Sequence, residues 1–277
     1  MNKEIKSFLL GMMTLFLLLS SQRGLAELDV SFDFNPIMAG NFYMGNEMTG
    51  EKIWVKITRP FEIMTTEVTQ KQWFSVMGDN PSFFNRPEDC DDKHKYVETE
   101  KGQVVGLCPD HPVEQVSYAQ VQEFINKLNE DKGDFCGSQD LRNKIGCVRL
   151  PTEAEWEYSA RAGSNMRYCF GNDPLILKDF AIYRATSENR THKVKSKTKN
   201  NWSLYDMYGN VWELVEDVWN RTLPGGEDPL VTVGHGHVIR GGSWNSLFER
   251  NLVSGIRLLY NSDFKSPVIG FRLVRNL

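Results

Sequence analysis

The feature that most constrains this chain is a dense run of glycine, aromatic and acidic residues at Leu204–Glu213. Asp206 and Glu213 lie on either side of a Gly209-Asn210 pair, which is typical of a turn. Such a turn can direct both carboxylates and neighbouring backbone carbonyls towards one point, and calcium prefers oxygen ligands of this kind. Neither helical nor strand periodicity explains the run. We therefore expect a loop that a bound cation holds together, beneath a functional surface. The run itself specifies no reaction.

The overall composition is that of a folded protein with a substantial core. The chain has 277 residues, of which 40% are hydrophobic and 12% aromatic. These residues supply enough apolar surface to bury, so disorder is not expected. A net charge of -4 and a pI of about 5.8 give no basic face for nucleic acid. Residues 27–277 contain no linker, repeat or low-complexity tract, which predicts one continuous domain.

Residues 1–26 have the layout of a secretory signal peptide. Lys3 and Lys6 precede an apolar run from Phe8 to Leu19, and Gly24-Leu25-Ala26 then offers small residues for cleavage. The run is shorter than the roughly 20 residues that a transmembrane helix needs. We therefore expect a periplasmic or secreted protein that does not span a membrane after signal removal. The cleavage point has no cysteine, which argues against a lipid anchor.

Export determines how the five cysteines are interpreted, because thiols usually pair in an oxidising compartment. Cys90 and Cys108 bracket one polar insert, and Cys136 and Cys147 bracket a second. Each disulfide would stabilise the fold by about 2–3 kcal/mol, by restricting the unfolded chain. Cys169 is left over, and we expect it to be a buried small hydrophobic residue instead of a nucleophile.

Three segments carry the same helix start signal, in which Ser or Thr is followed three residues later by Gln or Glu. These capping boxes begin at Thr69, Ser117 and Thr152. They predict a helix ending before Gly78, a longer one with Val121, Phe124, Ile125 and Leu128 on one face, and a third over residues 153–162 ended by Gly163.

The remaining sequence predicts short strands and irregular structure. Residues 35–45 favour a short strand broken by turns, and residues 54–58 alternate in polarity like a second strand. From Ser164 to Leu277 no amphipathic helix is evident, although the aromatic content favours a packed region. The expected fold class is α+β with unusually little regular secondary structure.

A series of ordered motifs resembles one family, that of formylglycine-generating enzyme, or sulfatase-modifying factor. The motifs are Met38–Gly45, Thr66–Thr69, Pro112–Ser117, Arg149–Tyr158, Leu204–Glu213, Arg240–Trp244 and Gly270–Arg272. The resemblance covers residues 34 to 275 and implies a fold distantly like that of C-type lectins, with structural calcium. The best-known members oxidise a sulfatase cysteine to formylglycine, using oxygen and copper(I) held by two cysteines. Relatives include hercynine oxygenases and a periplasmic pyoverdine-maturation protein.

The resemblance also implies a ligand set for calcium. The side chains of Asp206 and Glu213 and the carbonyls of Gly209 and Val211 occupy the positions of one family site. The alternative is a hydrogen-bonded turn that Asp206 merely caps. The family's second calcium site needs an asparagine where this chain has Ile182, so we expect that site to be lost, unless Glu188 or Asn189 replaces the ligand.

The catalytic positions depart from the family pattern. The family's two cysteines follow the Gly-Gly-Ser motif, and here their positions fall near Ser246 and near Phe248 or Glu249. No cysteine occurs after Cys169. Copper(I) selects soft sulfur donors, which the Ser246 hydroxyl does not provide, so copper and formylglycine generation are not expected. Ser243 lies at a family pocket position, but without a paired base a structural role is favoured. Trp244 and Arg257 are the other pocket candidates.

Other candidate residues favour structural roles. His235 and His237 are expected on a strand with both rings on one face, a spacing compatible with metal, but no third ligand is evident and solvated histidines are favoured. Arginines and tryptophans near the motifs are expected to bridge loops and fill the core, with a pocket lining as the alternative for the tryptophans. The residues concerned are Arg240, Arg257, Arg272, Trp202, Trp212 and Trp244.

Two functions from different classes remain open. The first is a calcium-stapled binding module that presents a surface to an extracytoplasmic protein, peptide or glycan. The second is an oxidoreductase of altered chemistry, active in the oxidative tailoring of an exported peptide or siderophore. An orthodox formylglycine generator is the least favoured. Metal content separates them, because iron or copper would favour the enzyme and calcium alone the module.

Overall fold

The computed structural model describes residues 30–277 except 47–49, 100, 131–135 and 137–140. The expected signal peptide at residues 1–26 lies outside the described residues. Within the described part of the chain, the helices are too short and too polar to cross a bilayer.

Four small sheets form the framework, and two of them have four strands. One has the order β1-β4-β13-β7 and joins both ends of the described chain, because β13 pairs with β4 and β7. Its strands are β1 (Phe34–Ile37), β4 (Phe61–Met64), β13 (Val274–Asn276) and β7 (Val148–Arg149). The other has the order β11-β10-β8-β12, with β8 and β12 parallel. Its strands are β11 (Arg257–Tyr260), β10 (His237–Arg240), β8 (Trp212–Val218) and β12 (Ile269–Phe271).

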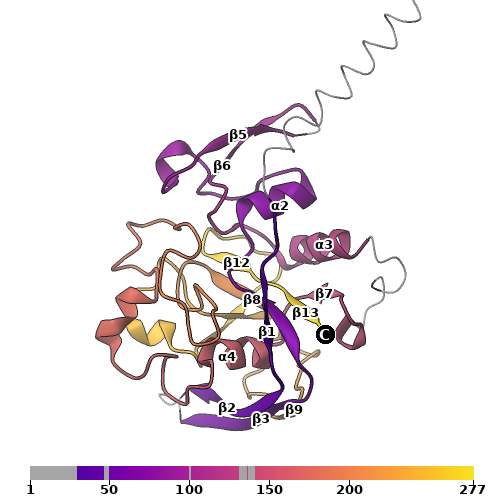
Figure 1. Cartoon of the computed structure of the whole chain (residues 1–277), viewed down its shortest axis with the longest axis vertical. Helices are drawn as coiled ribbons and strands as arrows, with labels where there is room; N and C mark the ends of the chain where they lie inside the picture. The colour runs from indigo at the N-terminus through magenta and orange to yellow at the C-terminus, as the bar shows by residue number, and fades with distance from the viewer. Residues whose placement is uncertain (1–29, 47–49, 100, 131–135, 137–140) are drawn as a thin grey trace, which may run out of the picture.

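Two smaller sheets lie at opposite ends of the molecule (Figure 1). The sheet β2-β3-β9 comprises β2 (Gly40–Asn46), β3 (Glu51–Ile57) and β9 (Gly226–Glu227). The other is the hairpin of β5 (Lys95–Glu98) and β6 (Val104–Leu107), which projects from the body. This hairpin lies within the polar insert that Cys90 and Cys108 bracket, and only Val97 and Leu107 of its strands are buried.

The three α-helices of the described residues begin where their capping boxes predict, at α2 (Gln70–Met77), α3 (Tyr118–Asn129) and α4 (Glu153–Arg161). In each, the N-cap hydroxyl accepts the N3 amide and the N3 side chain returns the bond. Gly78 ends α2 with φ of 74°. The prediction of Gly163 as the C-cap of α4 is wrong by one residue, because Ala162 takes the left-handed cap with φ of 46°. The short 3₁₀ helices are Pro87–Asp89, Leu141–Asn143, Pro174–Asp179 and Glu249–Leu252.

Aromatic residues from distant segments fill the core. In one cluster Trp73 of α2 stacks on Phe124 of α3 at 5.2 Å between ring centroids, and Phe271 meets both rings edge-on. A second cluster surrounds α4 and includes Trp156 and Tyr208. After residue 163 the described chain forms strands and 3₁₀ turns without an α-helix, which confirms the predicted low content of regular structure.

Both expected disulfides are formed, Cys90–Cys108 and Cys136–Cys147. Together they are consistent with an extracytoplasmic protein, because such bonds persist in oxidising compartments. Cys169 is free and buried, as expected, and burial raises the pKa of its thiol to about 11. A thiol of this kind is a poor nucleophile near neutral pH.

Candidate functional site

The turn before β8 brings the predicted calcium residues into one buried region. Asp206 and Asn210 both adopt left-handed backbone conformations, with φ of 58° and 57°. Gly209 also has a positive φ of 87°, and a Cβ there would meet the carbonyl of Ile182. Glycine is therefore required at this position by both backbone conformation and close approach. The turn is fixed from outside by bonds from Gly209 N–H to Gly241 O and from Asn210 N–H to Ile182 O.

Glu213 lies on β8 and is already engaged by protein donors. Arg272 donates from Nε to its Oε2 and from Nη2 to its Oε1, each at 2.6 Å. Trp156 Nε1 also donates to Oε2, at 2.7 Å. This two-bond pair is strong and directional, so Glu213 is the least available of the four predicted calcium ligands.

Asp206 is the more available carboxylate. Its Oδ2 accepts the backbone N–H of Lys195 at 2.9 Å, whereas its Oδ1 is buried without a hydrogen-bond partner. Burial raises the pKa of Asp206 to about 6, with the charge of Glu213 adding to the rise and Lys195 N–H and Arg272 opposing it. An unpartnered buried carboxylate oxygen is costly unless a proton or a cation satisfies it.

Glu67, which the sequence did not single out, completes the cluster. It is fully buried, and its oxygens accept bonds from Asn210 Nδ2 at 3.3 Å and Val211 N–H at 3.4 Å. Burial, followed by the charges of Asp206 and Glu213, raises the pKa of Glu67 well above its ordinary value. Glu67, Asp206 and Glu213 thus share this region with the single guanidinium of Arg272. When all three carboxyls are ionised, the region has an excess of negative charge that a divalent cation would offset.

The residues present fit a calcium ion, on the evidence of the orphaned Asp206 Oδ1. Within the described ranges, no three acidic, histidine or cysteine side chains converge closely enough to hold a metal by themselves. Carbonyl oxygens, such as those predicted at Gly209 and Val211, would therefore have to complete the ligand set. At the family's second site, Ile182 is buried in the core and Glu188 is exposed beside Arg190, so neither supplies an evident ligand.

The loop at the family's catalytic position is held by its two serines. Ser246 Oγ accepts the Ser243 N–H at 3.0 Å, and Ser246 N–H donates to Ser243 O at 2.9 Å. Ser243 Oγ accepts the N–H of Asn245. Ser243 and Ser246 are both buried. Their hydroxyls stabilise the turn through these hydrogen bonds, at the position where the family's thiolates bind metal.

An exposed apolar surface surrounds this loop. Leu247 and Phe248 are 62% and 46% exposed. The neighbouring Trp244 is half-buried, donates from Nε1 to Pro267 O, and meets Phe84 edge-on with centroids 5.3 Å apart. Phe84 in turn meets Phe83, which is 54% exposed. We call Phe83, Trp244, Leu247 and Phe248 the aromatic rim.

Beneath the rim lies Glu114, a buried carboxyl that holds the Phe83-Phe84 segment. Its Oε1 accepts the Phe84 N–H at 2.9 Å, whereas its Oε2 has no hydrogen-bond partner. Burial raises the pKa of Glu114 to about 8, although backbone hydrogen bonds from this segment oppose the rise.

Arg257, predicted as a pocket residue, lies on β11 and pairs with Glu153 through bonds of 2.6 and 2.7 Å. Arg240 is buried against Glu153 and Glu157 of α4. Together with the Arg272–Glu213 pair, these contacts place Arg240, Arg257 and Arg272 in ion pairs, as the sequence favoured. A cavity of about 210 Å³ lies elsewhere, between the end of β3, the start of β4 and the C-terminal residues, and none of the predicted site residues lines it.

The expectation of two histidines on one strand face is wrong. Only His237 lies in β10, because Gly236 has φ of 68° and ends the extended conformation before it. His237 is not solvated either, since its ring stacks on Tyr118 at 3.5 Å between centroids and its Nδ1 is buried without a partner. Desolvation lowers the pKa of His237.

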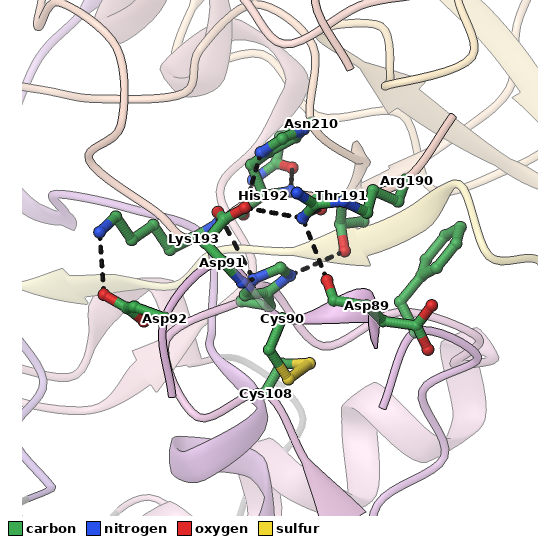
Figure 2. Close-up of polar contacts among 12 residues, drawn as sticks. Asp89, Cys90, Asp91, Asp92, Cys108, Arg190, Thr191, His192, Lys193 and Asn210 are labelled. Carbon is green, nitrogen blue, oxygen red and sulfur yellow. Dashed lines mark hydrogen bonds and ion pairs between the residues drawn. A yellow bond between two sulfur atoms is a disulfide. The ribbon is translucent and has the colours of Figure 1, made fainter. Parts of the chain in front are cut away.

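A second polar cluster, centred on Asp91, was not anticipated (Figure 2). Asp91 accepts bonds from Arg190 Nη1 at 2.7 Å, His192 Nδ1 at 3.0 Å and Lys193 N–H at 2.7 Å. Burial alone would raise the pKa of Asp91, but these donors outweigh it and hold the pKa well below its usual range. His111 Nε2 lies 3.6 Å from Asp91 Oδ2, and burial lowers the pKa of His111 to about 4.

Comparison with known proteins identifies the architecture. A family model described as sulfatase-modifying factor enzyme 1-like domain matches residues 33–277. The chain belongs to the sulfatase-modifying factor family. A formylglycine-generating enzyme of Streptomyces coelicolor is 30% identical over 72% of this chain and 59% of that enzyme. The chaperone protein LppX of Paenibacillus barcinonensis is 26% identical over 95% of this chain and 98% of that protein.

Solved structures of this fold family support the same assignment. Treponema denticola variable protein 1 superposes with a TM-score of 0.75 at 30% identity, covering 90% of this chain and 96% of that one. PvdO of Pseudomonas aeruginosa gives a TM-score of 0.67 at 25% identity, covering 88% of this chain and 94% of that one. The fold is therefore the α+β sulfatase-modifying factor fold, whereas its likeness to C-type lectins stays a prediction.

Proposed function

We propose that this protein is an extracytoplasmic binding module that keeps the sulfatase-modifying factor scaffold and has lost formylglycine-generating chemistry. The observation that carries the proposal is the loop at the family's catalytic position. Ser246 stands where a thiol is expected, and its hydroxyl is engaged by Ser243 within the turn. The chain's only unpaired cysteine is Cys169, and its raised pKa does not favour the thiolate that copper(I) needs.

The full-length relatives support a binding role. LppX is named a chaperone, and the Treponema protein is named a variable protein. Neither name describes an oxidation. In contrast, this chain covers 59% of the Streptomyces formylglycine-generating enzyme, so the similarity to that enzyme spans the shared domain only.

The aromatic rim is the surface that we assign to the partner, which we expect to be an extracytoplasmic protein or peptide. Tryptophan and phenylalanine supply large rigid contact areas, and such residues dominate the energetics of interfaces. Three of the four rim residues, Trp244, Leu247 and Phe248, lie on the loop at the family's catalytic position. Arg250 stacks over Phe248 at 4.3 Å and adds a positive charge. The buried acidic cluster, with calcium bound, would hold the framework beneath it.

A capture experiment with rim variants that introduce negative charge tests the proposal. Purified protein would be cross-linked in the extracytoplasmic fraction of the source cells, and recovered partners quantified by mass spectrometry. Leu247→Asp and Phe248→Asp, combined, are expected to reduce recovery of a specific partner at least tenfold, because each buried anchor contributes about 2 kcal/mol or more. The matched control is Val233→Asp, since Val233 is 81% exposed and lies outside the rim. Equal recovery by all three proteins would contradict the assignment of the rim.

Metal content and reaction with a peptide distinguish the oxidoreductase alternative from the binding module. Protein loaded with copper(I) would be incubated with oxygen and a Cys-x-Pro-x-Arg peptide, and the product examined for loss of sulfur. We expect neither stoichiometric copper nor conversion of the peptide. Turnover of the peptide, or tightly bound iron or copper in the isolated protein, would refute the non-catalytic proposal and favour an altered or retained oxidation.

A further inference from the structure

Asp91 joins two segments that are far apart in the sequence. Its carboxylate accepts three short bonds from the segment 187–195, which we call the basic loop, and these come from Arg190, His192 and Lys193. Arg190 Nη1 also donates to the carbonyl of Asp89 at 3.0 Å. Figure 2 shows these donors converging on the chain beside the disulfide. The insert between Cys90 and Cys108 therefore makes most of its bonds to the basic loop through Asp91, and the exposed pair of Asp92 with Lys193 Nζ at 2.9 Å adds one further contact.

The Cys90–Cys108 disulfide ties that residue to the body of the protein. Cys108 is fully buried, and its N–H donates to Gln70 Oε1 of α2 at 2.9 Å. Cys90 precedes Asp91 directly and is half-buried. The backbone N–H of Asp91 also donates to His111 Nε2 at 3.2 Å. Because residues 90–94 are irregular, the disulfide is the covalent restraint that fixes the position of Asp91.

The basic loop leads directly to the acidic cluster. His192 N–H donates to Asn210 Oδ1 at 3.0 Å, and Asn210 Nδ2 returns a bond to His192 O at 3.2 Å. Two residues after Lys193, Lys195 N–H donates to Asp206 Oδ2. One continuous path of contacts thus runs from the disulfide through Asp91 and the basic loop to the turn at Asp206–Asn210.

We propose that the Cys90–Cys108 disulfide is a redox-sensitive latch, which holds the basic loop closed through Asp91 and releases it on reduction. The released loop presents the Arg190 guanidinium, the His192 ring and the Lys193 N–H without their carboxylate partner. The inference does not depend on the proposed binding function, because it concerns only the closure of the loop.

The redox step needs a dithiol as the reductant. A thiolate of the dithiol attacks Cys90 Sγ, the more exposed sulfur, and Cys108 leaves as a thiolate that takes up a proton. The second thiol of the reductant then displaces Cys90 from the mixed disulfide. The protein gains two electrons and two protons, and the dithiol becomes an intramolecular disulfide.

Trypsin reports the state of the loop, because Arg190, Lys193, Lys195, Lys197 and Lys199 are all cleavage sites within or just beyond it. The full chain would be digested with and without a small dithiol, and cleavage between residues 190 and 199 compared with cleavage at the exposed Arg221 in the same digest. Reduction is expected to accelerate cleavage in the loop at least tenfold relative to Arg221. An unchanged ratio, with thiol titration showing Cys90 and Cys108 reduced, would overturn the proposal.

Three variants separate the latch from general loosening. Cys136→Ser with Cys147→Ser removes the other disulfide and is expected to keep the response to dithiol. Cys90→Ser with Cys108→Ser is expected to be cleaved rapidly in the loop with or without dithiol. Asp91→Asn keeps both disulfides and is expected to show the same rapid cleavage under oxidising conditions, so it tests the path even where the double variant does not fold. Slow cleavage of oxidised Asp91→Asn, or a response that persists without Cys90 and Cys108, refutes the latch.

Discussion

At the scale of single residues, the recurrent theme is a buried carboxyl group that lacks a full set of partners. Asp206 Oδ1 and Glu114 Oε2 are both buried without a hydrogen bond. Burial raises the pKa of each group, to about 6 and about 8, because water no longer solvates the charge. Such groups make stability depend on pH and on cations.

Glu114 is expected to make the protein less stable as pH rises. Its carboxyl keeps a proton up to about pH 8 when folded but ionises near its ordinary pKa of 4.5 when unfolded. The unfolded state therefore binds fewer protons between these values, and the free energy of unfolding falls by about 2–4 kcal/mol across this interval. Glu114→Gln should remove this decrease in the free energy of unfolding, which urea denaturation from pH 4.5 to 8.5 measures. Glu123→Gln, at an exposed position on α3, is the control. Parallel curves for wild type and Glu114→Gln would contradict the assignment.

Calcium is expected to stabilise the protein more at pH 8 than at pH 5. Calcium competes with the protons that Asp206, with its pKa of about 6, and Glu67 bind at the lower pH. Calcium at a hundred times its dissociation constant would add about 2.7 kcal/mol at the higher pH. Thermal unfolding with calcium or with chelator measures the effect, which Asp206→Asn should abolish. Asp263→Asn, on an exposed turn, should respond like the wild type. A calcium-induced shift that survives Asp206→Asn would place the ion elsewhere.

At the scale of elements, α4 is notable because all of its residues are buried although four of the nine are charged. The charges are compensated by neighbouring elements: Arg240 of β10 meets Glu153 and Glu157, and Arg161 bonds Glu157 within the helix. Glu157 also accepts the N–H of Gly45 from β2. The helix is thus an ionic junction between sheets, and its stability depends on complete pairing.

Breaking this junction is expected to be costly. Arg240→Ala removes the guanidinium that faces both carboxylates and leaves their charge buried, which should lower the free energy of unfolding by about 3–5 kcal/mol. Lys127→Ala breaks the exposed pair with Glu123 and should cost less than about 1 kcal/mol. Chemical denaturation of both variants measures the difference. Similar losses for the two would show that the α4 network is not stabilised by its pairing.

At the scale of the whole molecule, long-range pairing replaces regular secondary structure. The sheet β1-β4-β13-β7 unites strands from both ends of the described chain, and β8 lies between β10 and the parallel strand β12. Between these sheets, irregular loops are fixed by contacts such as Asp91 to His192, 101 residues apart. The aromatic rim and the latch lie on loops that this framework positions, and the acidic cluster combines loop residues with Glu213 of β8.

The sequence by itself determined the locally encoded features. Capping boxes at Thr69, Ser117 and Thr152 depend on residues three apart, so they were predictable without a fold. Cysteine positions around the polar inserts predicted both disulfides, and ordered motifs predicted the family. The signal peptide and the bound calcium ion stay predictions from the sequence.

Only the tertiary structure decided which polar groups meet. Glu67 joins Asn210 across 143 residues, and Arg190 joins Asp91 across 99. The tertiary structure also showed that the His237 ring stacks on Tyr118 instead of facing solvent. The physical reason is that hydrogen bonds and ion pairs between distant segments depend on how the strands and loops pack, and no local periodicity in the sequence records that packing.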